Sequence, residues 1–102
     1  MAATVIWLHA ALAELESIGE TIDANSRAYS TIVVKKLYDA TQDLALFPRM
    51  GRRVPEWDDD SYRERIVYSY RVIYRIVSEE RVELLAFIHG ARLLPDAIRE
   101  RK

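Results

Sequence analysis

The chain has 102 residues, of which 50% are hydrophobic and 30% are charged, a composition typical of globular proteins rather than disordered ones. This length suits one domain, which we expect to span residues 1–102. The 15 basic and 16 acidic side chains give a formal net charge of −1, which disfavours a general nucleic-acid binder but still allows a local basic patch. Because the sequence has no cysteine, disulfides and thiolate chemistry are excluded.

We expect neither a targeting segment nor a membrane span in this sequence. Its start lacks the basic and apolar parts of a signal peptide, and no apolar run approaches the roughly 20 residues that cross a bilayer. His9 and His89 are the two histidines, and neither belongs to a paired-histidine spacing typical of a metal site. We therefore expect a cytoplasmic protein with no membrane contact, no metal and no cofactor.

A short strand and two helices are predicted in the first half of the chain. Residues 4–8 are apolar and β-prone, which indicates a strand. Apolar residues then recur every three or four positions along two stretches, the spacing of one helix face. The first stripe is Leu12, Leu15, Ile18 and Ile22, and the second is Tyr29, Val33, Leu37, Ala40, Leu44 and Phe47. Asn25 or Ser26 suits the N-cap of the second helix and Pro48 its end, so the two helices form a hairpin whose apolar stripes need a cover.

A loop and three strands are predicted in the second half. Residues 48–60 contain two prolines, a glycine and a run of three aspartates, which is typical of a loop. Residues 62–68, 70–77 and 82–89 are rich in Val, Ile, Tyr and Phe, and the short links between them require antiparallel hairpins. The predicted fold class is therefore α+β, with a β-α-α-β-β-β order and the helical hairpin packed on one face of an antiparallel sheet.

Arginines alternate along the predicted strands. Arg63 and Arg65 share one face of their strand, as do Arg71 and Arg75 of the next, and His89 closes the last strand. If odd-numbered positions align across the sheet, all five side chains gather on one face, where they could hold a phosphate backbone. The alternative is a sheet that is covered on one side and shows ordinary polar residues to water on the other.

His89 has two interpretations as well. A histidine at the end of an apolar strand often binds a backbone carbonyl, which would make it structural. Imidazole also accepts and donates protons near neutral pH, so His89 suits general acid–base catalysis if a substrate reaches it. Tyr62 and Tyr70 are candidates for stacking on a base, with ordinary packing as the alternative, and His9 is interpreted as structural.

Four segments resemble the RelE/ParE toxin superfamily. Residues 46–56 are similar to the family's loop, which runs from a leucine-rich helix end through Pro and Gly to Val-Pro-Glu. Arg63-Glu64 resembles the Arg-Glu that opens the following strand. Residues 70–76 (Tyr-Arg-Val-Ile-Tyr-Arg-Ile) are similar to the family's Tyr-Arg-hydrophobic-hydrophobic-Tyr signature, and residues 88–92 (Ile-His-Gly-Ala-Arg) resemble the segment that leaves the last strand. The four motifs occur in the family's order, and together with the β-α-α-β-β-β order the match covers essentially the whole chain.

The resemblance implies a toxin that is neutralised by a cognate antitoxin encoded beside it, in a toxin–antitoxin hetero-oligomer. RelE-like members cleave mRNA on the ribosome, whereas ParE-like members act on DNA gyrase and have no established hydrolytic site. The fold alone does not choose between these two activities. A third alternative is a non-toxic member that retains only the fold and antitoxin binding.

The nuclease pattern carries over to this sequence only in part. Its basic positions fall on Arg63, Arg65, Arg71 and Arg92, all of which are present, with His89 as a substitute acid or base. Its C-terminal tyrosine would fall near Ile98, which cannot transfer a proton. The Val-Pro-Glu loop and residues 89–92 are closer to ParE, so we favour gyrase inhibition over mRNA cleavage.

The resemblance also leads to expectations about binding surfaces. We expect the antitoxin to lay an extended segment and a helix on exposed apolar surface. For the gyrase interaction we expect an exposed C-terminal stretch, residues 92–102, whose removal would leave the domain folded.

Overall fold

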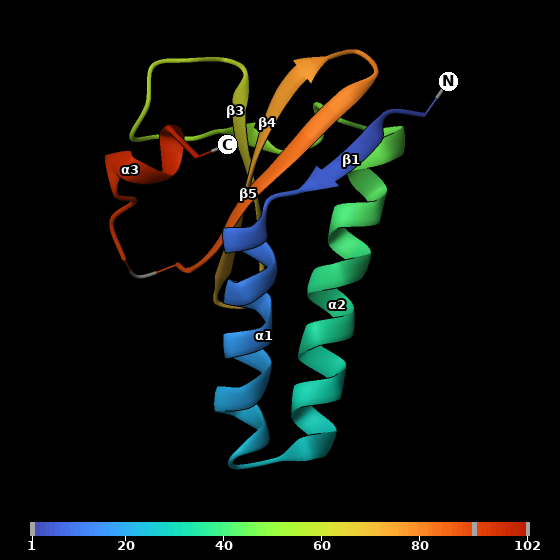
Figure 1. The fold of residues 1–102 in the computed structure, drawn as a ribbon, viewed down its shortest axis with the longest axis vertical. Coiled ribbons are helices and arrows are strands. Elements are labelled where there is room, and N and C mark those ends of the chain that lie inside the picture. Colours follow the sequence, from blue (N-terminus) through green and yellow to red (C-terminus); the bar gives the residue numbers. More distant parts are fainter. Residues whose placement is uncertain (1, 91, 102) are drawn as a thin grey trace.

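A computed structural model describes residues 2–90 and 92–101 of the chain (Figure 1). Its elements follow in the order β1 (Thr4–Trp7), α1 (His9–Asp23), α2 (Arg27–Leu46), β2 (Arg52–Arg53), β3 (Tyr62–Val67), β4 (Tyr70–Ser78), β5 (Arg81–His89) and α3 (Asp96–Arg99). Two helices and four strands were predicted close to these positions, whereas β2 and α3 were not. No described helix is long and apolar enough to cross a membrane.

Local signals set the limits of the helical hairpin. The side chain of Ser26 accepts a hydrogen bond from the backbone N–H of Tyr29 at 3.2 Å, which confirms the predicted N-cap of α2. The helix ends at Leu46, just before the predicted stop at Pro48. At Gly19 of α1 an added Cβ would lie 3.1 Å from a methyl group of Val34, so a small residue there lets the two helices approach closely.

The sheet is mixed, with strand order β1-β5-β4-β3-β2. β2, β3, β4 and β5 pair antiparallel in sequence, as the short connections require. β1 runs parallel to β5, so the expectation of a fully antiparallel sheet does not hold at this edge. The difference arises because β1 is joined to the rest of the sheet through the helical hairpin and not through a tight turn, so its direction is not fixed by a turn.

The helices cover one face of the sheet, as predicted. Buried residues of α1 and α2 pack there against alternate residues of the strands. This core contains Ala11, Leu15, Val33, Leu37, Ala40, Leu44, Val67, Val72, Tyr74, Val82, Leu84 and Phe87. Three members of the predicted stripes are exposed instead: Leu12, Tyr29 and Phe47. Figure 1 shows that the hairpin extends beyond the sheet, so residues near its far end have no strand to cover them.

The opposite face of the sheet is also buried, which the sequence did not predict. The loop that follows β2 and the C-terminal tail (residues 92–101) fold over this face and form a second core. It contains Leu8, Val54, Trp57, Tyr62, Ile73, Leu85, Ala86, Leu94 and Ile98. Trp57 is only 3% exposed and lies edge-on to the Tyr62 ring, with ring centroids 5.1 Å apart. The sheet is therefore the middle of three layers.

Candidate functional site

The strand register divides the predicted basic face between the two sides of the sheet. A two-residue turn joins β3 to β4, so odd-numbered residues of β3 pair with even-numbered residues of β4. Arg63 and Arg65 therefore lie on the face covered by the helices, and Arg71 and Arg75 lie on the other. His89 pairs with an even-numbered residue of β4 and shares the side of Arg63 and Arg65. The alignment of odd-numbered positions that would gather all five residues on one face therefore does not occur.

Arg63 and Arg65 hold neighbouring segments of the chain. Arg63 donates to the backbone oxygens of Asp60 at 2.8 Å and Gly51 at 3.1 Å, and it pairs with the Asp60 carboxylate at 3.0 Å. Arg65 donates to the last turns of α2, at the backbone oxygen of Ala40 (3.0 Å) and the carboxylate of Asp43 (3.1 Å). Both guanidinium groups are thus occupied by acceptors within the protein.

Arg71 is buried between two carboxylates. Its side chain is 7% exposed; Nε donates to Glu64 at 2.7 Å, and Nη1 and Nη2 each donate to a different oxygen of Glu56 at 2.7 Å. The side chain of Glu64 is fully buried and receives a further ion pair from Arg52 at 2.6 Å. The second oxygen of Glu56 also accepts the backbone N–H of Leu94 at 3.0 Å. This network, which we call the Arg71 clamp, ties β3, β4, the loop and the tail together.

The electrostatics of the Arg71 clamp favour its charged form. Hydrogen bonds from Arg71 hold the pKa of Glu56 at about 2, against an ordinary value of 4.5, although burial acts in the opposite direction. The same hydrogen bonds raise the pKa of Arg71. Because its donors already face two carboxylates, Arg71 is poorly placed to bind a phosphate group.

His89 and Arg92 lie at the end of β5. The exposed ring of His89 stands edge-on to Tyr70, with ring centroids 5.7 Å apart, and the Arg92 N–H donates to the His89 carbonyl at 3.0 Å. A pocket of about 630 Å³, which we call the His89 pocket, is lined here by Arg52, Pro55, Glu56, Ile66, Tyr68, Ser69, Arg71, His89, Gly90 and Leu93. Of the predicted nuclease residues, it brings together only Arg71 and His89. Ala91, part of the family-like segment, lies outside the described residues.

The C-terminal tail is anchored rather than free. Leu94 and Ile98 are 6% and 3% exposed, and the Tyr62 hydroxyl donates to the Arg99 carbonyl at 3.1 Å. Near the end, Arg101 pairs with Glu14 of α1 at 2.9 Å and donates to the backbone oxygen of Leu85, also at 2.9 Å. Leu85 is skipped in the pairing of β5 with β4, so Arg101 donates its hydrogen bond to a carbonyl at an irregular point of the strand.

Most residues of the tail are exposed, as expected, but Leu94, Ile98 and Arg101 anchor it to the domain. That its removal leaves the domain folded stays a prediction. Ile98, the residue in place of the nuclease tyrosine, belongs to the second core and not to the His89 pocket. Lys102 lies outside the described residues.

Sequence reasoning missed the acidic partners. Glu64 is a charged residue at an inward position of β3, which was a usable signal because a carboxylate rarely lies in a core without a cation. Glu56 and Glu14 gave no local signal, since their partners are 15 and 87 residues away. Within residues 2–90 and 92–101, no group of three or more His, Cys, Asp or Glu side chains could hold a metal ion.

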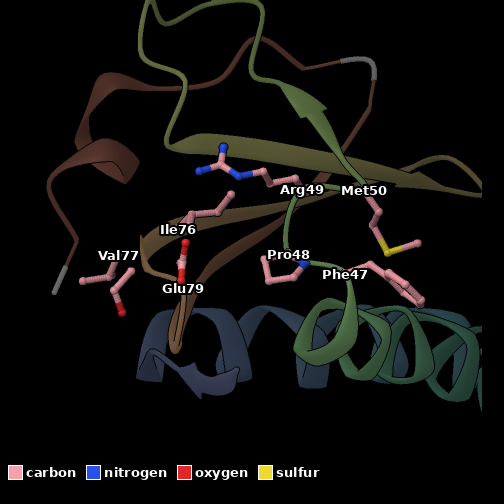
Figure 2. Close-up of a pocket in the computed structure, with 8 residues that line it drawn as sticks. Phe47, Pro48, Arg49, Met50, Ile76, Val77 and Glu79 are labelled. Carbon is pink, nitrogen blue, oxygen red and sulfur yellow. The ribbon is translucent and has the colours of Figure 1, made fainter. Parts of the chain in front are cut away.

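A second pocket, of about 670 Å³, lies where α2 ends and the β4–β5 turn begins (Figure 2). We call it the Phe47 pocket. Its lining is mainly apolar and consists of Phe47, Pro48, Arg49, Met50, Ile76, Val77, Ser78 and Glu79. No predicted site residue takes part in it.

Comparisons with known proteins agree with the motifs. No curated protein matches the chain in sequence. A structure described as the chromosomal ParDE toxin–antitoxin system from P. aeruginosa has the same fold, with a TM-score of 0.71 and 14% identity over 86% of this chain and 96% of that chain. The family model for the ParE toxin of the type II toxin–antitoxin system parDE matches residues 5–94. The chain therefore belongs to the ParE family of type II toxins.

Proposed function

We propose that this toxin inhibits DNA gyrase by binding it, and that a cognate antitoxin neutralises it in a hetero-oligomer. The observation that carries the proposal is the Arg71 clamp. The arginine that a nuclease would direct at the scissile phosphate is instead enclosed by Glu56 and Glu64. A binding inhibitor needs no such free cation.

The other predicted nuclease residues support the same choice. Arg63 and Arg65 are paired with Asp60 and Asp43, so they offer little net charge to an RNA backbone. They also lie on the face of the sheet opposite to Arg71. A ribonuclease needs donors that converge on one phosphate, and these three do not.

The rim of the His89 pocket is suited to a protein partner. Ile66, Tyr68 and Leu93 are 55%, 52% and 86% exposed there. Exposed apolar side chains around charged groups are typical of protein interfaces. We infer that this rim contacts gyrase, and we expect the toxin to act in the cytoplasm, where its target works.

A supercoiling assay on purified gyrase tests the proposal, together with mapping of mRNA cuts after expression without antitoxin. We expect loss of supercoiling and intact mRNA. Leu93→Glu should weaken inhibition by about tenfold or more because it places a charge on the proposed contact. The matched control is Leu46→Glu, at a residue that is 67% exposed and lies outside the His89 pocket, and it should inhibit normally.

The alternative activity makes the opposite prediction. His89 is the predicted acid or base that lines the His89 pocket, and loss of such a group typically lowers a rate by roughly 10²–10⁴. Cuts at codon spacing that disappear in His89→Ala would establish the endoribonuclease and end the gyrase proposal. Normal growth and unaffected gyrase would indicate the non-toxic alternative.

A further inference from the structure

The Phe47 pocket is an apolar surface that the toxin's own chain leaves open. Phe47, Met50 and Val77 of its lining are between 42% and 63% exposed, although each is a large hydrophobic residue. Figure 2 shows Phe47 and Met50 on one side of the pocket and Ile76, Val77 and Glu79 on the other. A small protein seldom exposes such a cluster unless another molecule covers it.

The charges around the Phe47 pocket favour a basic partner. Arg49 lies 3.8 Å from the Asp60 carboxylate, which also pairs with Arg63 at 3.0 Å, so Asp60 compensates the charge of Arg49 only weakly. In the described part of the chain the carboxylates of Glu79 and Glu80 have no ion-pair partner. The pocket also lies at the C-terminal end of α2, whose last turn has no basic residue to offset the negative end of the helix dipole. Glu79, Glu80 and the helix end outweigh the single cation Arg49, so the charge around the apolar lining is negative on balance.

We propose that the antitoxin anchors itself in the Phe47 pocket with a bulky apolar side chain that is flanked by a lysine or arginine. The inference rests on the proposal that an antitoxin neutralises this toxin. A long-lived partner suits this surface better than a transient target does, because obligate interfaces are the more hydrophobic ones. The lining of the His89 pocket contains more ionisable side chains, among them Arg52, Glu56 and Arg71, which suits the transient target.

A second copy of this chain fits the Phe47 pocket less well. A symmetric dimer would use the same patch on both subunits and would bring the two sets of Glu79 and Glu80 together. Like charges brought together in an interface oppose association. The antitoxin can instead supply the opposite charge.

The test measures the affinity of the purified toxin for the purified antitoxin encoded beside it, by calorimetry. Val77→Glu places a charge in the apolar wall of the pocket and should weaken binding by about 30-fold or more. The matched control is Ile32→Glu, at a residue of similar exposure (56%) that lies 15 residues before Phe47 on α2, about 22 Å along the helix. It should bind as the wild type does, and circular dichroism melts should show both variants folded.

A second pair of variants tests the charge. Glu79→Lys should weaken binding several-fold, and the loss should shrink as salt rises. Glu20→Lys, at an exposed position of α1, is its control and should change little.

Each other outcome has a distinct meaning. Unchanged affinity in Val77→Glu, or a loss only in Ile32→Glu, would overturn the inference. If a folded Val77→Glu variant binds the antitoxin normally but no longer inhibits gyrase, the Phe47 pocket is a gyrase contact and the inference is overturned. Self-association of the wild type that Val77→Glu abolishes would overturn the inference as well. If the wild type itself does not bind the antitoxin, the proposed neutralisation fails, which separates that result from a misplaced site.

Discussion

The two faces of the sheet are both buried, but by different means. Under α1 and α2, long periodic stripes of apolar residues form the core. On the other face an irregular loop and a four-residue helix supply isolated apolar side chains, and polar contacts hold them in place: the Arg71 clamp, the bond from Tyr62 to the Arg99 carbonyl, and the Arg101–Glu14 pair. The helix-covered face is stabilised mainly by burial, whereas the tail-covered face depends on a few specific contacts whose loss should release it.

Removal of Arg71 is expected to have the largest effect. Arg71→Met leaves the buried carboxylate of Glu64 with only the partly exposed Arg52, and it frees Glu56, so we expect a loss of about 3–5 kcal/mol in the free energy of unfolding. Urea denaturation at pH 7 measures it. Arg75→Met is the control, because the pair of the exposed Arg75 with Glu83 is long (3.7 Å) and should contribute less than about 1 kcal/mol. Equal losses in the free energy of unfolding of the two variants would show that the Arg71 clamp stabilises the fold no more than an exposed arginine does.

A pair of core truncations compares the two faces directly. Leu37→Ala, at a fully buried position of α2, should cost about 2–5 kcal/mol. Ile98→Ala should cost no more than the low end of that range, about 2 kcal/mol, because the tail can detach before the rest unfolds. Hydrogen exchange in Ile98→Ala should speed up in the tail and leave α2 protected. Faster exchange throughout the sheet would mean that the tail and sheet unfold as one unit.

Acid should act on the tail-covered face first. The pKa of Glu56 is about 2 in the folded protein and near 4.5 when unfolded, so its charged form contributes stability above pH 4.5 that is lost as the pH falls towards 2. Because Glu56 is partly exposed, solvent screening limits the size of this contribution. Urea titrations between pH 6 and pH 3 should show a shallower loss for Glu56→Gln than for the wild type. If the free energy of unfolding fell with pH equally in the two proteins, the result would contradict the ion pair assigned to Glu56 and Arg71.

The smallest expected effect concerns the end of the tail. Arg101→Met removes the pair with Glu14 and leaves the Leu85 carbonyl without this donor, for which we expect a loss of about 1–2 kcal/mol. Thermal melting of this variant measures the change. Arg99→Lys, whose pair with Asp59 is long at 3.6 Å, serves as the comparison and should melt close to the wild type.

Periodic features of the fold were predictable from the sequence, and features set by distant partners were not. Ser26, Pro48 and the apolar stripes gave local signals for both long helices, and Val- and Ile-rich runs gave the strands. Which residues of β3 and β4 share a face of the sheet depended on the length of the turn between the two strands. Tyr68 occupies the left-handed region there (φ 52°) without the glycine or asparagine that would have announced a two-residue turn.

The candidate site shows the same limit. Arg71 and His89, two of the candidate nuclease residues, line one pocket, but the ion pairs of Arg71 depend on Glu56 and Glu64, which approach it only in the folded chain. The second core could not be predicted from the sequence either. Val54, Trp57, Leu94 and Ile98 are separated by polar residues in irregular segments, so no periodicity links them.

The positions of the two tryptophans give each face of the sheet its own optical probe. Trp7 lies on the helix side, 5.4 Å from the Phe87 ring by centroids, whereas Trp57 lies under the tail with the Arg99 guanidinium 6.0 Å from its ring. Indole fluorescence shifts to longer wavelength when water reaches the ring. Replacing one tryptophan at a time with phenylalanine would therefore let a spectrometer follow release of the tail separately from opening of the helical hairpin, in the free toxin and while a partner binds.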